Sequence, residues 1–284
     1  MIITSVTNEK VKQVAKLQKS ASERREKALF VVEGLRLFMD APVDMIHEVY
    51  YTETFYERLV KSVDNDEYGN SVDINRSCYK TVNCLKAEGK AYPVSDNVLR
   101  KMSDTVNPQG ILSLVSIPSD EAEFFSAGEA SDVSSDLILL LEDIQDPGNM
   151  GTIIRMAEGA GVTDIYASPN SADIYSPKVV RSTMGSIFRM KLHPSADLIK
   201  VSDKLKDNGV VIFAAHLNGK DVYDEDFTGP TAFLIGNEGK GLTRELSEKA
   251  DRLIRIPMNG KVESLNAAMS STILCYEALR QRRK

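Results

Sequence analysis

The feature that most constrains the fold is a regular alternation of apolar runs and helical segments after residue 136. Runs rich in Ile, Leu, Val and Phe predict five strands, at 137–144, 163–168, 209–217, 231–236 and 252–258. The segments between and after them predict helices at 150–161, 176–188, 195–208, 243–250 and 264–281. Apolar strands separated by helices are typical of a parallel sheet that is covered on both faces. We therefore expect an α/β fold here.

The first part of the chain is patterned less regularly. A helix is predicted at 8–21 because Val11, Val14 and Leu17 recur at helical spacing. Further expected elements are strands at 28–34, 47–52 and 110–118 and helices at 54–63 and 95–103. The acidic, serine-rich stretch that follows has no periodic pattern and predicts a linker. The expected domains are therefore 1–118 and 136–284, with a linker at 119–135.

Composition narrows the class of protein. The 284 residues suit one medium domain and a smaller one, and 42% hydrophobic with 27% charged residues is ordinary for a globular enzyme. No apolar run reaches the roughly 20 residues that span a bilayer, and the N-terminus lacks a signal-peptide pattern. The three cysteines cannot all pair and have no zinc spacing. We expect no membrane segment, no metal site and a cytoplasmic location.

The net charge of −6 opposes binding to a polyanion, but its distribution is uneven. Basic residues gather in the first 27 residues, and the chain ends on RQRRK. Such a helical face can be merely solvated, or it can bind phosphates. The candidates for RNA binding are Lys16, Lys19, Arg24 and Arg25.

Three loops are candidates for the chemistry, because ligands of open parallel sheets bind beyond the carboxyl ends of the strands. They are EDIQDPGNMG at 142–151, GNEGKG at 236–241 and PMNGKVESLN at 257–266. The second loop lacks the spacing of a nucleotide-triphosphate loop, and no G-x-G-x-x-G follows any strand. Its glycines permit positive φ and a close approach of the backbone to a ligand.

Residues in the other two loops have both structural and chemical interpretations. Asn149 can cap a helix that starts near Met150, and Ser264 can cap the last helix, with Asn266 in its first turn. Arg155 then lies about a turn and a half into its helix. There it can strengthen anion binding at the helix start or pair with Glu158.

Together the motifs DPGNMGTIIRMAEGAG, FLIGNEGKGL and IRIPMNGKVESLNAAMSSTILCYEAL resemble, in this order, the SpoU/TrmH family of the SPOUT superfamily. These proteins are S-adenosylmethionine-dependent RNA 2′-O-ribose methyltransferases. The segments ITSVTNEKVKQVAKL, FVVEG and PQGILSLV resemble the family's substrate-binding extension, which is related to the ribosomal L30e fold.

The resemblance implies a parallel-sheet SPOUT domain with a deep trefoil knot, an L30e-like RNA-binding domain and a homodimer with the last helix at its interface. It implies S-adenosyl-L-methionine in the knot and RNA, most readily ribosomal RNA, as substrate. The implied cofactor-binding residues are Gly236, Asn237, Gly239, Ile256, Met258, Ser264 and Leu265. The implied catalytic residues are Asn149, Arg155, Glu238, Ser264 and Asn266.

A guanidinium with a pKa above about 12 is a poor proton acceptor. We therefore expect Arg155 to bind the adjacent phosphate and to stabilise the developing alkoxide, while the other four residues orient the ribose. The proton acceptor is left open between a phosphate, Glu238 and water. The alternatives are a transfer-RNA methyltransferase, a non-catalytic RNA-binding protein that keeps the fold, and a nicotinamide-dependent oxidoreductase.

Overall fold

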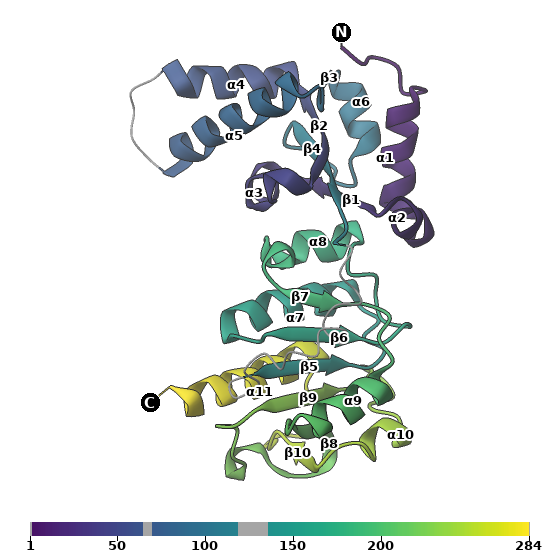
Figure 1. The fold of residues 1–284 in the computed structure, drawn as a ribbon, viewed down its shortest axis with the longest axis vertical. Helices are drawn as coiled ribbons and strands as arrows, with labels where there is room; N and C mark the ends of the chain where they lie inside the picture. The colour runs from purple at the N-terminus through teal and green to yellow at the C-terminus, as the bar shows by residue number, and fades with distance from the viewer. Residues whose placement is uncertain (1, 65–69, 119–135, 284) are drawn as a thin grey trace. The chain divides into compact units, whose positions relative to one another are not determined.

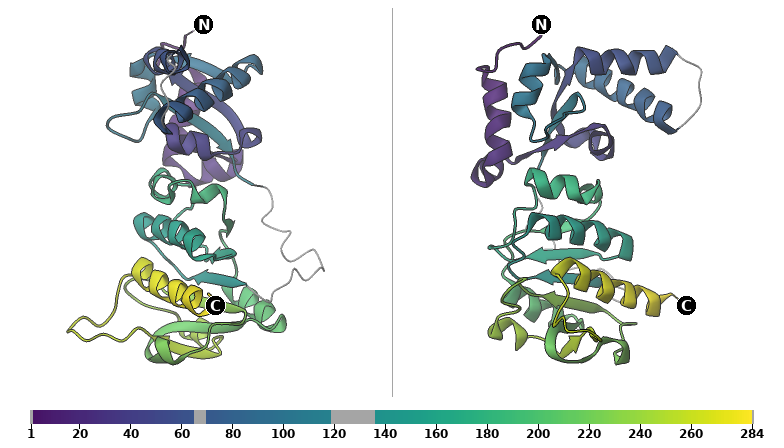
Figure 2. Two further views of the ribbon diagram at one scale, coloured as in Figure 1. Left: turned by 90° about the vertical axis from the view of Figure 1, so that its left-hand side faces the viewer. Right: turned by 180° about the vertical axis from the view of Figure 1, so that it is seen from behind.

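The computed structural model describes residues 2–64, 70–118 and 136–283. Its internal contacts divide these residues into two compact units (Figures 1 and 2). The first unit contains the described residues up to 118 together with Tyr175–Phe188, and the second contains the rest. The predicted linker at 119–135 lies outside the described residues.

The first unit is built on a mixed four-stranded sheet in the order β1-β4-β2-β3. Its strands are β1 (Leu29–Glu33), β2 (Ile46–Thr52), β3 (Ala91–Val94) and β4 (Ile111–Ser116). The central strand β4 is antiparallel to both β1 and β2, and β3 is parallel to β2. The three strands expected from the sequence are present, and β3 is additional. Its Tyr92 and Pro93 are only partly buried, so it carries a weak apolar signal.

Helices surround this sheet. They are α1 (Glu9–Lys19), α2 (Ala21–Lys27), α3 (Leu35–Asp40), α4 (Glu53–Asp64), α5 (Asn70–Ala87), α6 (Asp96–Met102) and α8 (Pro177–Thr183). The helical spacing of α1 is confirmed, because Val11, Val14 and Leu17 are all buried. The Asn8 side chain caps α1 by accepting a hydrogen bond from Lys10 N at 2.9 Å.

Although α8 lies between two strands of the second sheet in the sequence, it belongs to the first unit. The segment that carries it packs on β1, where the ring centroid of Phe30 lies 5.0 Å from Tyr175 and 6.1 Å from Phe188. Arg181 of α8 also forms an ion pair with Asp104 at 2.8 Å. Sequence periodicity identifies a helix here but gives no information on its packing partner.

The second unit is a six-stranded parallel sheet in the order β10-β8-β9-β5-β6-β7. Its strands are β5 (Leu137–Leu141), β6 (Asp164–Ala167), β7 (Lys191–His193), β8 (Val211–Asp221), β9 (Thr231–Ile235) and β10 (Arg252–Arg255). The predicted α/β fold with a parallel sheet is thus confirmed. The edge strand β7 was missed because it has only three residues, none of them fully buried.

The helices of this unit are α7 (Pro147–Ala160), α9 (Leu198–Asp207), α10 (Arg244–Ser247) and α11 (Ala267–Arg282). Figure 2 shows α7 and α11 on one face of the sheet and α9 on the other. The side chains of Leu198, Val201 and Leu205 enter a core formed with β5, β8 and β9. No helix in the described part of the chain is long and apolar enough to cross a membrane.

The strand order reverses at β5, whose neighbours are β6 on one side and β9 on the other. A crevice opens at such a point, outside the carboxyl ends of the strands. The loops that follow β5 and β9 leave the sheet there, side by side.

Candidate active site

The two loops at the reversal point are joined by hydrogen bonds. The Asn237 Nδ2 donates to the carbonyl oxygen of Asp143 at 2.8 Å. The carboxylate of Glu142 accepts from the backbone N and the hydroxyl of Thr243, each at 2.7 Å. These contacts fix the loop after β9 against the end of β5.

The loop after β9 is a tight turn closed on itself. Asn237 N donates to Gly241 O at 3.1 Å, and Gly241 N donates to Asn237 O at 2.9 Å. The Asn237 Oδ1 accepts from the backbone N of Gly239 and of Lys240, both at 3.0 Å. The Asn237 side chain therefore stabilises the turn through its Oδ1 and joins it to the loop after β5 through its Nδ2.

The backbone of its own loop leaves no room for a side chain at Gly236. A Cβ at this position would lie 2.3 Å from the carbonyl carbon of Gly241 and 2.3 Å from Leu242 N. The sequence suggested that this glycine lets the backbone approach a ligand, whereas the close neighbour is the return of its own loop. A side chain at 236 would therefore displace the turn before it reached any ligand.

Glu238 joins this turn to the start of α7. Its carboxylate accepts from the Asn149 Nδ2 at 3.1 Å and from the backbone N of Gln145 and Asp146, each at 3.4 Å. Partial burial by itself would raise the pKa of Glu238, but these hydrogen bonds outweigh it and lower the pKa. Glu238 is therefore a carboxylate at neutral pH.

The start of α7 differs from the prediction. The helix begins at Pro147, and its cap is Asp146, whose Oδ1 accepts from Asn149 N at 2.8 Å. The prediction that Asn149 caps a helix starting near Met150 was therefore wrong. Proline is suited to the first helical position because its fixed φ is helical and it has no N–H to satisfy. The Asn149 amide is thereby available to bind Glu238.

The start of α11 also differs. Asn266 is the cap of this helix, since its Oδ1 accepts from Met269 N at 2.7 Å and the first helical residue is Ala267. The prediction that Ser264 caps the helix and Asn266 lies in its first turn was wrong by two positions. The result leaves Ser264 on the segment before the helix, where it lines a pocket.

That pocket has a volume of about 440 Å³ and lies between the turn after β9, the middle of β8 and the segment that follows β10. All seven residues assigned to the cofactor line it: Gly236, Asn237, Gly239, Ile256, Met258, Ser264 and Leu265. Glu238 lines it as well. Two segments of the chain, at 236–239 and 256–265, are thus brought together around one cavity.

Three assigned catalytic residues do not line this pocket. Asn149 is bound to Glu238, Asn266 caps α11, and Arg155 is exposed on α7. Arg155 follows Pro147 by eight residues, about two turns into the helix rather than one and a half. Glu158, its proposed ion-pair partner, is bound by Arg189 through Nη2 at 3.1 Å. Among the residues that the structure describes, no hydrogen bond or ion pair holds the Arg155 guanidinium.

One side of the pocket was not predicted from the sequence. Ala215, His216 and Leu217, in the middle of β8 just past its last pair with β9, line it, and Leu217 is 60% exposed. A partial signal was present, because the apolar run at 209–217 was recognised as a strand, although the strand continues to Asp221. It was not selected because the strand order, which places β8 beside β9, cannot be read from the sequence.

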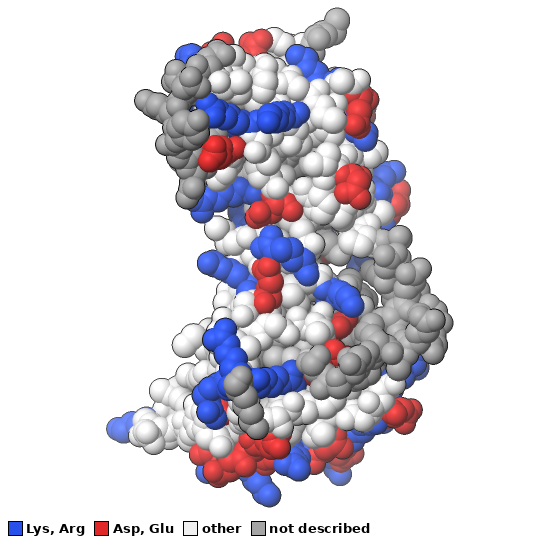
Figure 3. Space-filling model, turned by 60° about the vertical axis from the view of Figure 1, so that its left-hand side comes forward, with Lys and Arg blue, Asp and Glu red and all other residues white. Residues whose placement is uncertain are grey.

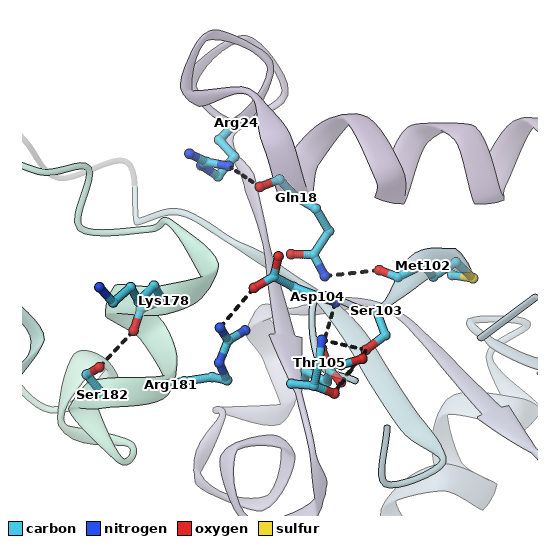
Figure 4. A network of polar contacts seen from close by, with 10 residues as sticks. Gln18, Arg24, Met102, Ser103, Asp104, Thr105, Lys178, Arg181 and Ser182 are labelled. Carbon is cyan, nitrogen blue, oxygen red and sulfur yellow. Dashed lines mark hydrogen bonds and ion pairs between the residues drawn. The ribbon is translucent and has the colours of Figure 1, made fainter. Parts of the chain in front are cut away.

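The basic residues assigned to RNA binding separate into two groups. Lys16, Lys19 and Arg25 are exposed, but Arg24 is only 4% exposed. Figure 4 shows the Arg24 guanidinium directed at the carbonyl of Gln18, and it also donates to the carbonyl of Leu17. Arg24 therefore satisfies the carbonyls at the end of α1, and its assignment to the RNA-binding surface was wrong.

Charge is mixed over both units. Figure 3 shows lysines and arginines interspersed with acids on the face that it presents. Many cations are paired, such as Lys200 with Asp197 at 3.0 Å and Arg244 with Glu248 at 2.7 Å. Binding of a polyanion therefore depends on local groups of unpaired cations.

A doubly covered parallel sheet with a pocket beside β8 at the carboxyl ends of β9 and β10 defines an α/β enzyme domain. Two family models match the chain. The SpoU rRNA Methylase family matches residues 136–276, and the MRM3-like substrate binding domain matches residues 8–113.

Similar proteins and solved structures agree with these matches. The chain is 30% identical to an uncharacterized tRNA/rRNA methyltransferase of Synechocystis, over 98% of this chain and 93% of that protein. It is 28% identical to the 23S rRNA (guanosine(2553)-2′-O)-methyltransferase RlmP of Bacillus subtilis, over 96% and 97% of the two chains. The AdoMet-bound rRNA methyltransferase of Sinorhizobium meliloti has a TM-score of 0.78 at 27% identity, covering 100% of this chain and 99% of that one. The chain belongs to the SpoU/TrmH family of methyltransferases.

Proposed function

We propose that this protein transfers the methyl group of S-adenosylmethionine to a ribose 2′-hydroxyl of ribosomal RNA. The observation that carries the proposal is the pocket, whose lining contains every residue assigned to the cofactor from the family motifs. It is supported by relatives that match nearly the whole chain, among them RlmP, which is named as a 23S rRNA 2′-O-methyltransferase. Two similar solved structures contain AdoMet.

The residues present suit this cofactor. The cavity of about 440 Å³ lies within the range of small-molecule sites, roughly 300–1,000 Å³. Ile256, Met258 and Leu265 offer apolar surface for adenine and the methionine chain, and the turn after β9 offers backbone groups. When bound, S-adenosylmethionine supplies an electrophilic methyl group on a sulfonium.

The remaining residues act on the RNA. Arg155 binds the phosphate beside the target ribose and stabilises the oxyanion as the hydroxyl is deprotonated, because an exposed guanidinium is a fixed positive charge. Glu238 serves as a positioning residue. Its carboxylate is already satisfied by Asn149 and two backbone N–H groups, and its lowered pKa makes it a weak base. Ser264 orients the ribose from the rim of the pocket.

We further propose the finer features of the family. They are a trefoil knot formed by the segments around the pocket, an L30e-like domain at 1–118 that binds RNA, a catalytic domain at 136–284 and a cytoplasmic location, where ribosomal RNA is found. A homodimer through α11 is supported by the apolar side chains that this helix exposes, Met269 at 55% and Tyr276 at 45%. Single exposed apolar residues are ordinary, but two on one helix favour a contact.

The decisive experiment maps 2′-O-methyl groups across the ribosomal and transfer RNA of cells with and without this protein. We expect one ribosomal RNA position to lose its methyl group when the protein is absent. Loss of a transfer-RNA methyl group instead would favour the transfer-RNA alternative. No change in either RNA would favour a non-catalytic RNA-binding protein.

A variant tests the mechanism. Arg155→Ala should bind S-adenosylmethionine as the wild type does, yet lose roughly 10²-fold or more in turnover, as other oxyanion stabilisers do. Arg155→Lys should recover little, since a point charge does not reproduce a planar fork. The control is Arg244→Ala, which removes an exposed cation from α10. Near wild-type methylation by Arg155→Ala would leave Arg155 an ordinary surface cation.

A further inference from the structure

A second pocket lies in the first unit, between α3, α4, α5 and the loop before β4. Its volume is about 370 Å³, and we call it the amide pocket after the side chains of Asn75, Asn107 and Gln109 that line it. Leu35, Phe55, Arg58, Leu59 and Pro108 complete its wall, and among the residues that the structure describes no acidic side chain lines it.

The wall of the amide pocket is fixed by hydrogen bonds. The Gln109 Oε1 accepts from Leu35 N at 3.1 Å, and the Arg58 Nη2 donates to Gln109 O at 3.1 Å. Gly110, at φ 97°, brings the backbone so close to α4 that a Cβ would lie 2.6 Å from the Cβ of Phe55. The loop is therefore packed against α4 at its β4 end.

The same loop is also held at its other end. The carboxylate of Glu33 accepts from the Ser103 hydroxyl at 2.5 Å and from Asp104 N at 3.2 Å. Between these two anchors the chain leaves Asn107 exposed to solvent. An ordered loop that exposes an amide loses little conformational entropy when it binds a ligand.

The amide pocket combines the planar guanidinium of Arg58 with amide groups that have no hydrogen-bond partner among the described residues. The guanidinium of Arg58 lies over the Phe55 ring, 5.5 Å from its centroid. Among the described residues, the Asn107 amide and the Gln109 Nε2 make no hydrogen bond. Guanidinium planes stack on nucleobases, and amide side chains match the paired donors and acceptors of base edges. Phosphates alone would instead favour lysine and arginine.

We propose that the amide pocket binds one unpaired base of the RNA substrate, stacked on Arg58 and hydrogen-bonded by Asn107 and Gln109. This inference rests on the proposed function, because it takes RNA as the substrate. The first unit would then select RNA by a base held out of the helix, in addition to any contact with phosphates.

The test uses the full-length protein and two RNA hairpins of the same sequence, one of which lacks the bases of its single-stranded loop. The wild type should bind the complete hairpin roughly 10-fold more tightly, as expected for one stacked base. Asn107→Ala and Arg58→Lys should each remove most of this preference. The second variant keeps the charge but loses the guanidinium plane and the Nη2 hydrogen bond to Gln109 O.

Matched measurements separate the site from general effects. Lys61→Ala removes a cation from the same helix outside the pocket and should weaken binding to both hairpins equally. Melting temperature and S-adenosylmethionine affinity should remain at wild-type values in all three variants. Equal affinity of the wild type for the two hairpins would overturn the proposal, and so would an unchanged preference in both pocket variants. If the preference holds but ribosomal RNA is not methylated, the proposed function fails and the base site stands.

Discussion

At the residue scale, Glu238 illustrates how one side chain can join two loops of a site. Its carboxylate joins the turn after β9 to the first residues of α7 through three hydrogen bonds. Replacing it would release the Asn149 amide and two backbone N–H groups at once. Because unpaired donors near a helix start are costly, the effect should appear in stability as well as in turnover.

The pH dependence of stability tests this role. Since folding lowers the pKa of Glu238 below 4.5, its contribution is present above that value and is lost as the pH falls through the folded-state pKa. Glu238→Gln should therefore melt at a lower temperature than the wild type near neutral pH, and the difference should shrink below about pH 4.5. Thermal unfolding across this pH range measures it.

The matched control is Glu263→Gln, which changes an exposed carboxylate that lines the same pocket. Within the described residues Glu263 makes no hydrogen bond, so its replacement should leave the melting temperature nearly unchanged at every pH. A Glu238→Gln variant that melts like the wild type at pH 7 would contradict the positioning role.

At the scale of elements, both helices that border the site begin with a side-chain cap. Asp146 caps α7 and Asn266 caps α11, and each fixes the loop that precedes its helix. The family motif marked Asn266 as a candidate for orienting the ribose, whereas in the structure its side chain caps α11. The two roles can be separated, because serine and aspartate cap helices about as well as asparagine does.

Substitutions at Asn266 make this separation. Asn266→Ala should lower the free energy of unfolding by about 1 kcal/mol, the usual value of a cap. Asn266→Ser should restore that stability. If the side chain only caps α11, Asn266→Ser should also retain turnover, as measured by methyl transfer to ribosomal RNA.

One result would contradict capping as the sole role of Asn266. A stable Asn266→Ser variant with strongly reduced turnover would show that the amide acts on the substrate. Asp146→Ser is the matched control on α7 and should retain both properties, since the same exchange there keeps a cap.

At the scale of the whole molecule, an acidic protein must bind RNA through local clusters of cations. The cluster on α1 and α2 now consists of the exposed Lys16, Lys19 and Arg25, without the buried Arg24. Each phosphate contact that is lost should lower the slope of log affinity against log salt by about 0.7 to 0.9.

Replacing Lys16, Lys19 and Arg25 by glutamine should therefore weaken RNA binding and reduce the salt slope by about two to three. S-adenosylmethionine affinity, measured by calorimetry, should not change. The control replaces Lys200, Lys206 and Arg244, which are paired with acids in the second unit. Should the α1–α2 variant keep the wild-type slope, other cations such as those at the end of α11 must carry the RNA.

Much of the fold could be predicted from the sequence because its signals are local. Uniformly apolar strands such as β5 and β9 can only be buried on both faces, so they specify a covered parallel sheet. The helix α1 has its apolar residues at helical spacing, and the two loops that line the pocket, after β9 and β10, follow strands that were recognised. The short edge strand β7 and the mixed-burial strand β3 give no such signal.

Contacts between distant segments were decided only by the tertiary structure. The cap of α7 is Asp146 because Pro147 fits the first helical position, and this leaves Asn149 to bind Glu238, 89 positions away. Arg24 is buried because the end of α1 turns directly into α2 and leaves carbonyls that need a donor. The order of β8 beside β9 brings His216 to the pocket, and the packing of Tyr175–Phe188 on β1 assigns α8 to the first unit. A local pattern specifies which residues are apolar or polar, whereas which distant group satisfies each of them depends on how the whole chain packs.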